Sequence, residues 1–203
     1  MIDEGYIKFR SRWQKSPPLD NPEIDELIRW RRPLYATGLI GYVADCRVGY
    51  GNLSSRIAVP GQFVISGTQT GHLGDLGRKH FALVTACDIE ANLVESKGPV
   101  EASSESMTHA AIYALDPRFL AVVHVHSEEL WLRLIERAPT TVEGIGYGTP
   151  QMAQDLLRLF HETEFRQTGV AVMAGHRGGL ISTGNSVREA AERMLALNDA
   201  MAT

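Results

Sequence analysis

The chain has 203 residues, of which 44% are hydrophobic and 22% charged, and its formal net charge is −4. This size and composition fit one soluble globular domain, and the negative charge argues against a general nucleic-acid binder. No run approaches the length of a membrane span, and the first five residues have no apolar secretory core. Cys46 and Cys87 lack paired metal-motif spacing and fit a reduced setting better than a disulfide scaffold. We therefore expect a cytoplasmic protein without a nucleic-acid or membrane partner.

The first half of the chain predicts a helix followed by strands. Residues 1–20 are polar and are expected to form an irregular lead-in to a single domain at 21–203. Asn21-Pro22 starts a helical pattern that continues to about residue 46, in which Pro33 should kink or split the helix. The basic run 29–32 is interpreted as a solvated helix face. After a turn at 49–56, strands are expected at 57–59, 62–66, 82–86 and near 91–95, the first two forming a hairpin through 60–61.

The second half predicts helices interleaved with strands. Serines at 103–106 suit a helix start, and that helix should stop before Asp116-Pro117. The later helices are expected at 128–136, from 149 through 160, and from a capping box at Ser186 to about 199, with strands at 120–126 and 170–174. This order predicts an α/β three-layer αβα sandwich around a largely antiparallel or mixed sheet, because the early hairpins disfavour a purely parallel one.

Two histidines end the most apolar of these strands. On a strand, residues i and i+2 point the same way, so His124 and His126 should lie side by side. Neutral imidazoles so placed can bind one divalent metal, although this spacing alone is also common for structural or surface histidines. His176 follows the strand at 170–174 and precedes glycines, which makes it a candidate third ligand.

Other polar segments could complete a site. Glu105 could move a proton beside a metal, whereas Ser103 and Ser104 could bind an anion or simply cap the helix. The loops 51–54 and 66–71 are rich in glycine and hydroxyl residues and could donate to phosphate oxygens, but each is also typical of an ordinary turn. Neither loop matches a Walker or dinucleotide fingerprint.

Together these motifs resemble the class II aldolase/adducin family over roughly residues 30–200. The resemblance rests on Gly51-Asn52-Leu53-Ser54, the Ser/Thr/Gly loop, Ser103-Ser104-Glu105, His124-Val125-His126 and His176. It implies an αβα sandwich, usually a homotetramer, and a small-molecule substrate such as a sugar phosphate. It also implies a divalent ion, with Zn²⁺ favoured over Mn²⁺, Fe²⁺, Co²⁺ or Ni²⁺. The implied residue roles are His124, His126 and His176 as metal ligands, Glu105 as catalytic acid/base, and Asn52, Ser103, Ser104 and either Ser66-Gly67 or Thr70-Gly71 as substrate or phosphate contacts.

The resemblance predicts a metal-dependent aldolase-type lyase that makes or breaks a carbon–carbon bond through a stabilised enediolate. The sequence departs from the sugar-phosphate aldolases after His126, because only about twenty residues precede Gly146-Tyr147-Gly148 and none of them is tyrosine. Tyr147 could replace the family's catalytic tyrosine, but loop packing is the better interpretation. An epimerase, a dehydratase and a non-catalytic adducin-like interaction module therefore remain alternatives.

Overall fold

The computed structural model describes residues 5–43 and 48–201, so Cys46 lies outside the described residues. One eight-stranded mixed sheet, ordered β1-β7-β6-β5-β4-β8-β10-β9, forms the centre. Its strands are β1 (Arg10–Lys15), β4 (Asn52–Arg56), β5 (Phe63–Ser66), β6 (Phe81–Asp88), β7 (Leu93–Gly98), β8 (Ala121–His126), β9 (Val170–Val172) and β10 (Gly179–Gly184). The small strands β2 (Gly41–Val43) and β3 (Val48–Tyr50) form a separate antiparallel pair.

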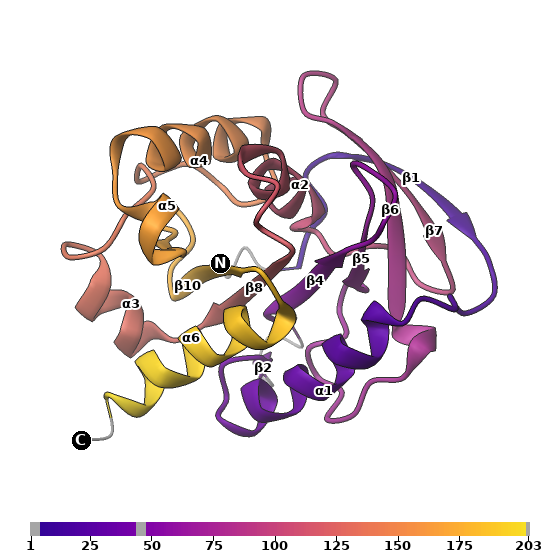
Figure 1. Ribbon diagram of the computed structural model, residues 1–203, viewed down its shortest axis with the longest axis horizontal. Helices are drawn as coiled ribbons and strands as arrows, with labels where there is room; N and C mark the ends of the chain where they lie inside the picture. Colours follow the sequence, from indigo (N-terminus) through magenta and orange to yellow (C-terminus); the bar gives the residue numbers. More distant parts are fainter. Residues whose placement is uncertain (1–4, 44–47, 202–203) are drawn as a thin grey trace.

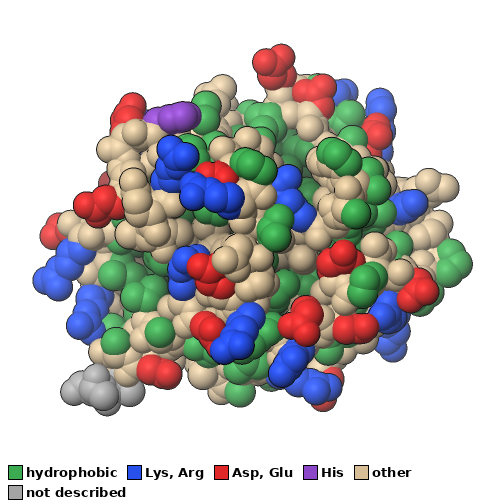
Figure 2. All heavy atoms as spheres, in the orientation of Figure 1, with side chains coloured by type: hydrophobic (Ala, Val, Ile, Leu, Met, Phe, Trp, Pro, Cys, Tyr) green, Lys and Arg blue, Asp and Glu red, His purple; other side chains and the backbone are tan. Residues whose placement is uncertain are grey.

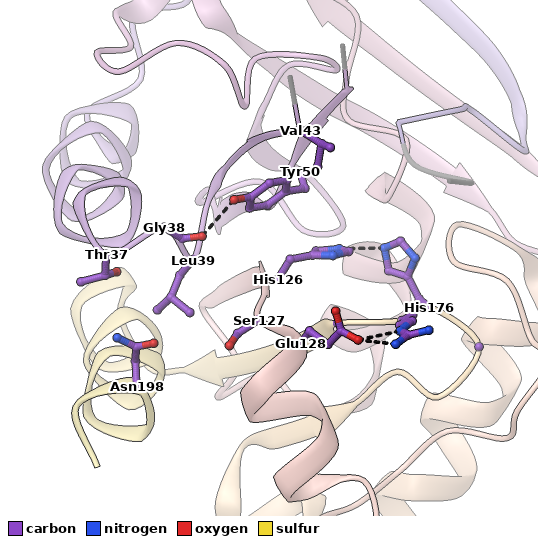
Figure 3. Close-up of a pocket in the computed structure, with 13 residues that line it drawn as sticks. Thr37, Gly38, Leu39, Val43, Tyr50, His126, Ser127, Glu128, His176 and Asn198 are labelled. Atoms are coloured by element: carbon purple, nitrogen blue, oxygen red, sulfur yellow. Dashed lines mark hydrogen bonds and ion pairs between the residues drawn. The ribbon is translucent and has the colours of Figure 1, made fainter. Parts of the chain in front are cut away.

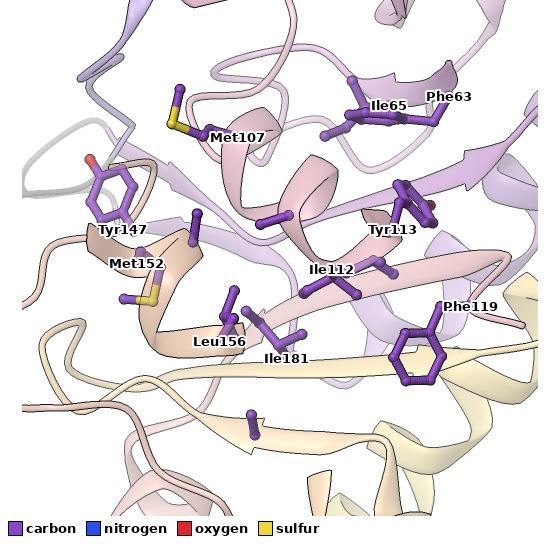
Figure 4. Close-up of a cluster of buried hydrophobic side chains, with 14 of the residues drawn as sticks. Phe63, Ile65, Met107, Ile112, Tyr113, Phe119, Tyr147, Met152, Leu156 and Ile181 are labelled. Carbon is purple, nitrogen blue, oxygen red and sulfur yellow. The ribbon is translucent and has the colours of Figure 1, made fainter. Parts of the chain in front are cut away.

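Helices cover both faces of the sheet, as the αβα prediction requires (Figure 1). The helices are α1 (Glu23–Ala36), α2 (Ser106–Leu115), α3 (Glu128–Leu134), α4 (Pro150–Glu162), α5 (Phe165–Thr168) and α6 (Val187–Asp199). Residues of α2, α4 and α5 pack with one face of the sheet in a core that includes Met107, Ile112 and Ile181 (Figure 4). Residues of α1, α3 and α6 pack on the other face. In the described part of the chain, no helix is long and apolar enough to cross a membrane.

Several sequence expectations are corrected by the fold. Residues 10–15 were expected to be irregular, but they form β1, which pairs in parallel with β7 and so satisfies its backbone groups at the sheet edge. The first hairpin strand lies at Asn52–Arg56 rather than 57–59, and β10 was not predicted. The first helix ends at Ala36 and continues through Pro33 without a break.

The basic run 29–32 is only partly solvated. Arg29 and Arg32 are exposed, but Arg31 is buried, and its guanidinium donates to the backbone carbonyls of Thr70, Gly71 and Gly74. Burial lowers the pKa of Arg31 to about 10. Elsewhere on the surface, positive and negative side chains are interspersed over the face in Figure 2. Arg31 therefore holds the loop after β5 in place through three backbone carbonyls, although its position in a charged run predicts a solvent-exposed side chain.

Candidate metal centre and active site

The histidine pair lies where β8 ends between two antiparallel neighbours. His124 is opposite Asn52 of β4 and Ile181 of β10, and His126 is opposite Gly179. Because side chains alternate along a strand, Val123 and Val125 point into the core beneath α1 and α6. His124 and His126 consequently share the opposite face, on which α2 begins.

His176 joins this pair from the turn between β9 and β10. The Nε2 atom of His126 lies 3.0 Å from Nε2 of His124 and 3.0 Å from Nε2 of His176. Figure 3 shows the rings of His126 and His176 directed toward each other. Gly179 permits this approach, because a Cβ there would lie 2.7 Å from the Cδ2 atom of His176.

Burial keeps the three imidazoles neutral. It lowers the pKa of His126 to about 4 and holds the pKa of His124 and of His176 well below the ordinary value. Nδ1 of His124 lies 3.0 Å from the carbonyl oxygen of Leu180, to which it donates a hydrogen bond, so Nε2 keeps its lone pair. The site therefore brings together three uncharged rings, and His124 directs a nitrogen lone pair toward the point where they meet.

Glu105 lies beside these nitrogens at the start of α2. Its Oε2 atom is 3.2 Å from Nε2 of His124, and its Oε1 atom is 3.9 Å from Nε2 of His176. Since His124 is neutral, this contact is not an ion pair. Burial raises the pKa of Glu105 to about 8, against the opposing effects of the Asn52 side-chain amide, 3.5 Å away, and the charge of Lys8. The carboxyl group can thus hold or release a proton near neutral pH.

The donor set fits a divalent metal. Nitrogen ligands about 2.0–2.1 Å from tetrahedral zinc are about 3.3 Å apart, close to the separations found here. The ligand atoms of His124, His126 and His176 all lie within 4.8 Å of one another, and within the described residues Oε1 of buried Glu105 has no hydrogen-bond partner. A cation bound there would be attracted to the ring nitrogens and would give the unpartnered carboxyl oxygen a ligand to bind. Three histidines with a carboxylate beside the open position are typical of a catalytic ion rather than a closed structural one.

The predicted substrate contacts gather in a small polar concavity next to this cluster. It is lined by Asn52, Gly67, Thr70, Gly71, Ser103 and Ser104. Ser66 is not among the lining residues; it is buried at the end of β5, where its hydroxyl accepts a hydrogen bond from Leu53 N–H. Both alternative matches of the Ser/Thr/Gly loop therefore contribute to one concavity, through Gly67 and Thr70-Gly71.

His126 and His176 also line a larger cavity of about 720 Å³. Tyr50, Ser127, Glu128 and Arg177 also line it, together with the turn after α1 (Figure 3). Arg177 forms an ion pair with Glu128 there. This volume is in the range that small-molecule sites occupy, so a substrate could approach the histidines from this side.

The sequence pointed to Tyr147, with loop packing as the preferred interpretation, but it did not indicate that Tyr6 and Lys8 pack against this side chain. Tyr147 is buried with its ring centre 4.4 Å from that of His176, and its hydroxyl accepts a hydrogen bond from Tyr6 N–H. Lys8 places its ammonium group over the Tyr147 ring. The glycines around Tyr147 were the only available signal, and they do not reveal which segment packs on the ring.

Solved structures of known proteins share this fold. The chain matches YgbL from Escherichia coli with 24% identity, a TM-score of 0.64, and coverage of 86% of this chain and 84% of that one. It matches l-fuculose-1-phosphate aldolase from Thermus thermophilus with 20% identity, a TM-score of 0.61, and coverage of 86% and 88%. The sugar-phosphate aldolase from Thermotoga maritima gives 17% identity, a TM-score of 0.62, and coverage of 87% and 92%. No curated protein sequence matches the chain.

The family comparison agrees with this architecture. Residues 46–203 match the model of the class II aldolase and adducin N-terminal domain. That region contains all three histidines, Glu105 and the six residues named above as lining the polar concavity. The chain thus belongs to the class II aldolase/adducin family.

Proposed function

We propose that this protein is a metal-dependent aldolase-type lyase acting on a small sugar phosphate or a related hydroxy-carbonyl compound. The observation that carries the proposal is the convergence of three neutral imidazole nitrogens beside the buried Glu105 carboxyl group. His124, His126 and His176 would hold the ion, with Zn²⁺ favoured on ligand type. When bound, the ion supplies the Lewis acidity that makes cleavage next to a carbonyl group accessible at neutral pH.

The chain's own residues would orient the substrate and move its proton. Glu105 would abstract or return a proton at the carbon next to the carbonyl, and the Asn52 amide would hold its carboxyl group in place. Ser103, Ser104 and the Thr70-Gly71 turn would bind the anionic end of the substrate in the polar concavity. Burial of Glu105 would keep bulk water from competing for that proton.

Metal content tests the first part of this proposal. Purified wild-type protein should contain close to one divalent ion per chain, and His126→Ala should lose it. His161→Ala is the matched control, because His161 is exposed on α4 and should leave the metal content unchanged. Wild-type protein that retains no Zn²⁺, Mn²⁺, Fe²⁺, Co²⁺ or Ni²⁺ after reloading and desalting would contradict the proposal.

A retro-aldol screen over ketose phosphates tests the reaction. Cleavage should require the metal and fall by at least about a hundredfold in Glu105→Gln, since general acid–base catalysis contributes roughly 10²–10⁴-fold. Cleavage that persists in this variant with metal bound would contradict the role of Glu105. Light scattering on the same samples checks the homotetramer that the resemblance implies.

Epimerisation or dehydration is the second candidate reaction, and the burial of Tyr147 favours it. Tyr147 is only 1% exposed and its hydroxyl already accepts a hydrogen bond, which suits loop packing better than donating a proton to a leaving group. In a dehydration Glu105 would remove the proton next to the carbonyl, and the hydroxyl on the adjacent carbon would leave as water. In an epimerisation Glu105 would remove the proton, and a second donor would return one to the opposite face of the substrate. Conversion of a substrate without carbon–carbon cleavage, dependent on Glu105, would select this reaction over the lyase.

A further inference from the structure

The N-terminal segment Gly5–Phe9 packs beside the candidate metal centre. It precedes the family-matched region, which begins at residue 46. Tyr6 N–H donates to the Tyr147 hydroxyl over 3.0 Å, Lys8 Nζ lies 3.8 Å from the centre of the Tyr147 ring, and Phe9 is buried in the core. These contacts hold the backbone on both sides of Lys8, and the Tyr147 ring is the surface on which its ammonium group lies.

Tyr147 connects this ammonium group to the histidine cluster. The ring centres of Tyr147 and His176 are 4.4 Å apart. Together with the 3.8 Å from Lys8 Nζ to the Tyr147 ring, this places the positive charge no more than about 8 Å from the centre of His176, which is close to the Debye length at physiological ionic strength. The intervening space is filled by a buried ring, so the interaction is screened less than it would be through water.

The charge of Lys8 acts on both sides of the cluster. It lowers the pKa of His176, in addition to the larger effects of burial and His126, and it lowers the pKa of Glu105 against the effect of burial. These effects agree with the geometry, in which the ammonium group lies over the Tyr147 ring that packs against His176 beside the candidate metal centre. A negative group bound there would be stabilised, and a neutral group would not.

We propose that Lys8 is a specificity-determining residue of the metal centre, which makes the open coordination position select small oxyanions, such as carboxylates, over neutral ligands. The effect passes through space and across the Tyr147 ring, and it does not require Lys8 to touch the ligand. This inference rests on the proposed function, because it needs a metal on His124, His126 and His176. If a bound anion lies about as far from Lys8 Nζ as the limit of about 8 Å for the His176 ring centre, one charge changes anion affinity roughly tenfold at an effective dielectric constant between 20 and 40.

The test compares anionic and neutral ligands on the Co²⁺-loaded protein, with binding followed through the visible absorption of the ion. Glycolate and azide are the anionic probes, and imidazole is the neutral one. Lys8→Met should weaken glycolate and azide about tenfold while imidazole affinity stays within about twofold, and Lys8→Arg should retain the anion affinity. Lys15→Met is the matched control, because Lys15 lies exposed at the end of β1, and it should leave all three affinities unchanged.

The outcomes separate this inference from the proposed function. Equal weakening of azide and imidazole in Lys8→Met would mean that the residue supports the site only structurally, which overturns the selectivity role. Unchanged anion affinity in metal-loaded Lys8→Met overturns it as well. Wild-type protein that takes up no Co²⁺ overturns the proposed function. If Co²⁺ uptake is normal but Lys8→Met changes the affinities for the anions and for imidazole equally, only the inference is overturned. The ratio of the two affinities is measured only on folded, metal-loaded molecules, so a partly unfolded variant cannot imitate the effect.

Discussion

Gly175 provides a sharp test of how the turn carrying His176 is built. A Cβ atom at this position would lie 2.2 Å from the carbonyl oxygen of Ile145 and 2.8 Å from that residue's backbone nitrogen. Ordinary contact begins near 3.4 Å, so Gly175→Ala requires one backbone segment to move by about 1 Å. The turn cannot shift freely, because His176 N–H donates to Met173 and Gly179 N–H donates to the carbonyl of His176.

The displacement should reduce both stability and metal affinity. Overpacking of a well-packed interior costs about 1–3 kcal/mol, and the upper end applies here because backbone atoms collide. In a chain of this size each kcal/mol lowers Tm by about 2–4 °C, which gives a fall of roughly 6–12 °C. Moving His176 from its place beside His126 should weaken Co²⁺ at least tenfold, as changes next to metal ligands commonly do.

Thermal unfolding of the metal-free protein and Co²⁺ competition titrations measure these two effects. Gly77→Ala is the control, since a Cβ there meets nothing within 4 Å and its φ of −126° is open to any residue. The reasoning is refuted if Gly175→Ala unfolds at the same temperature as Gly77→Ala and binds Co²⁺ equally well.

Two more substitutions test buried polar groups. Burial lowers the pKa of His109 from 6.5 to about 3, so over this range the unfolded state binds more protons than the native state and acid reduces stability. In the metal-free protein, urea titrations should show that His109 lowers the free energy of unfolding by about 2 kcal/mol between pH 6.5 and 5. The His109→Gln variant should lack this contribution to the pH dependence. A free energy of unfolding that depends on pH equally in both proteins contradicts the reasoning. Arg31→Met leaves three loop carbonyls without their donor and should cost about 3 kcal/mol in thermal unfolding, whereas exposed Arg29→Met should be nearly neutral. Equal unfolding temperatures for the two arginine variants would count against the buried role.

The features that could be predicted from the sequence are those with local causes. The alternation in β8 places His124 and His126 on one face because strand geometry requires it. Helix α6 begins after Ser186, whose hydroxyl accepts the Glu189 N–H as a capping residue should. The same local logic identified Glu105 at the start of α2. Whether these residues act as metal ligands and as an acid/base remains a prediction.

The features that could not be predicted depend on distant partners. β10 has the sequence GLISTG, in which a glycine stands at each end of only four other residues, and it is a strand because β8 and β9 pair with it on both sides. β1 is polar and exposed, and it is ordered by pairing with β7. Lys8 and Tyr147 meet across more than a hundred residues of chain, and no periodicity encodes such a contact.

The histidine cluster also connects metal binding with folding. Its ligands come from β8 and from the turn before β10, about fifty residues apart, and they converge only when these strands pair with Gly179 opposite His126. A slip of one residue along β8 would turn both of its histidines to the other face of the sheet. An ion that binds this native arrangement alone would add about 2.7 kcal/mol of stability at a free concentration one hundred times its Kd. The supply of metal would then change the fraction of protein molecules that are folded, whether or not they are catalysing a reaction.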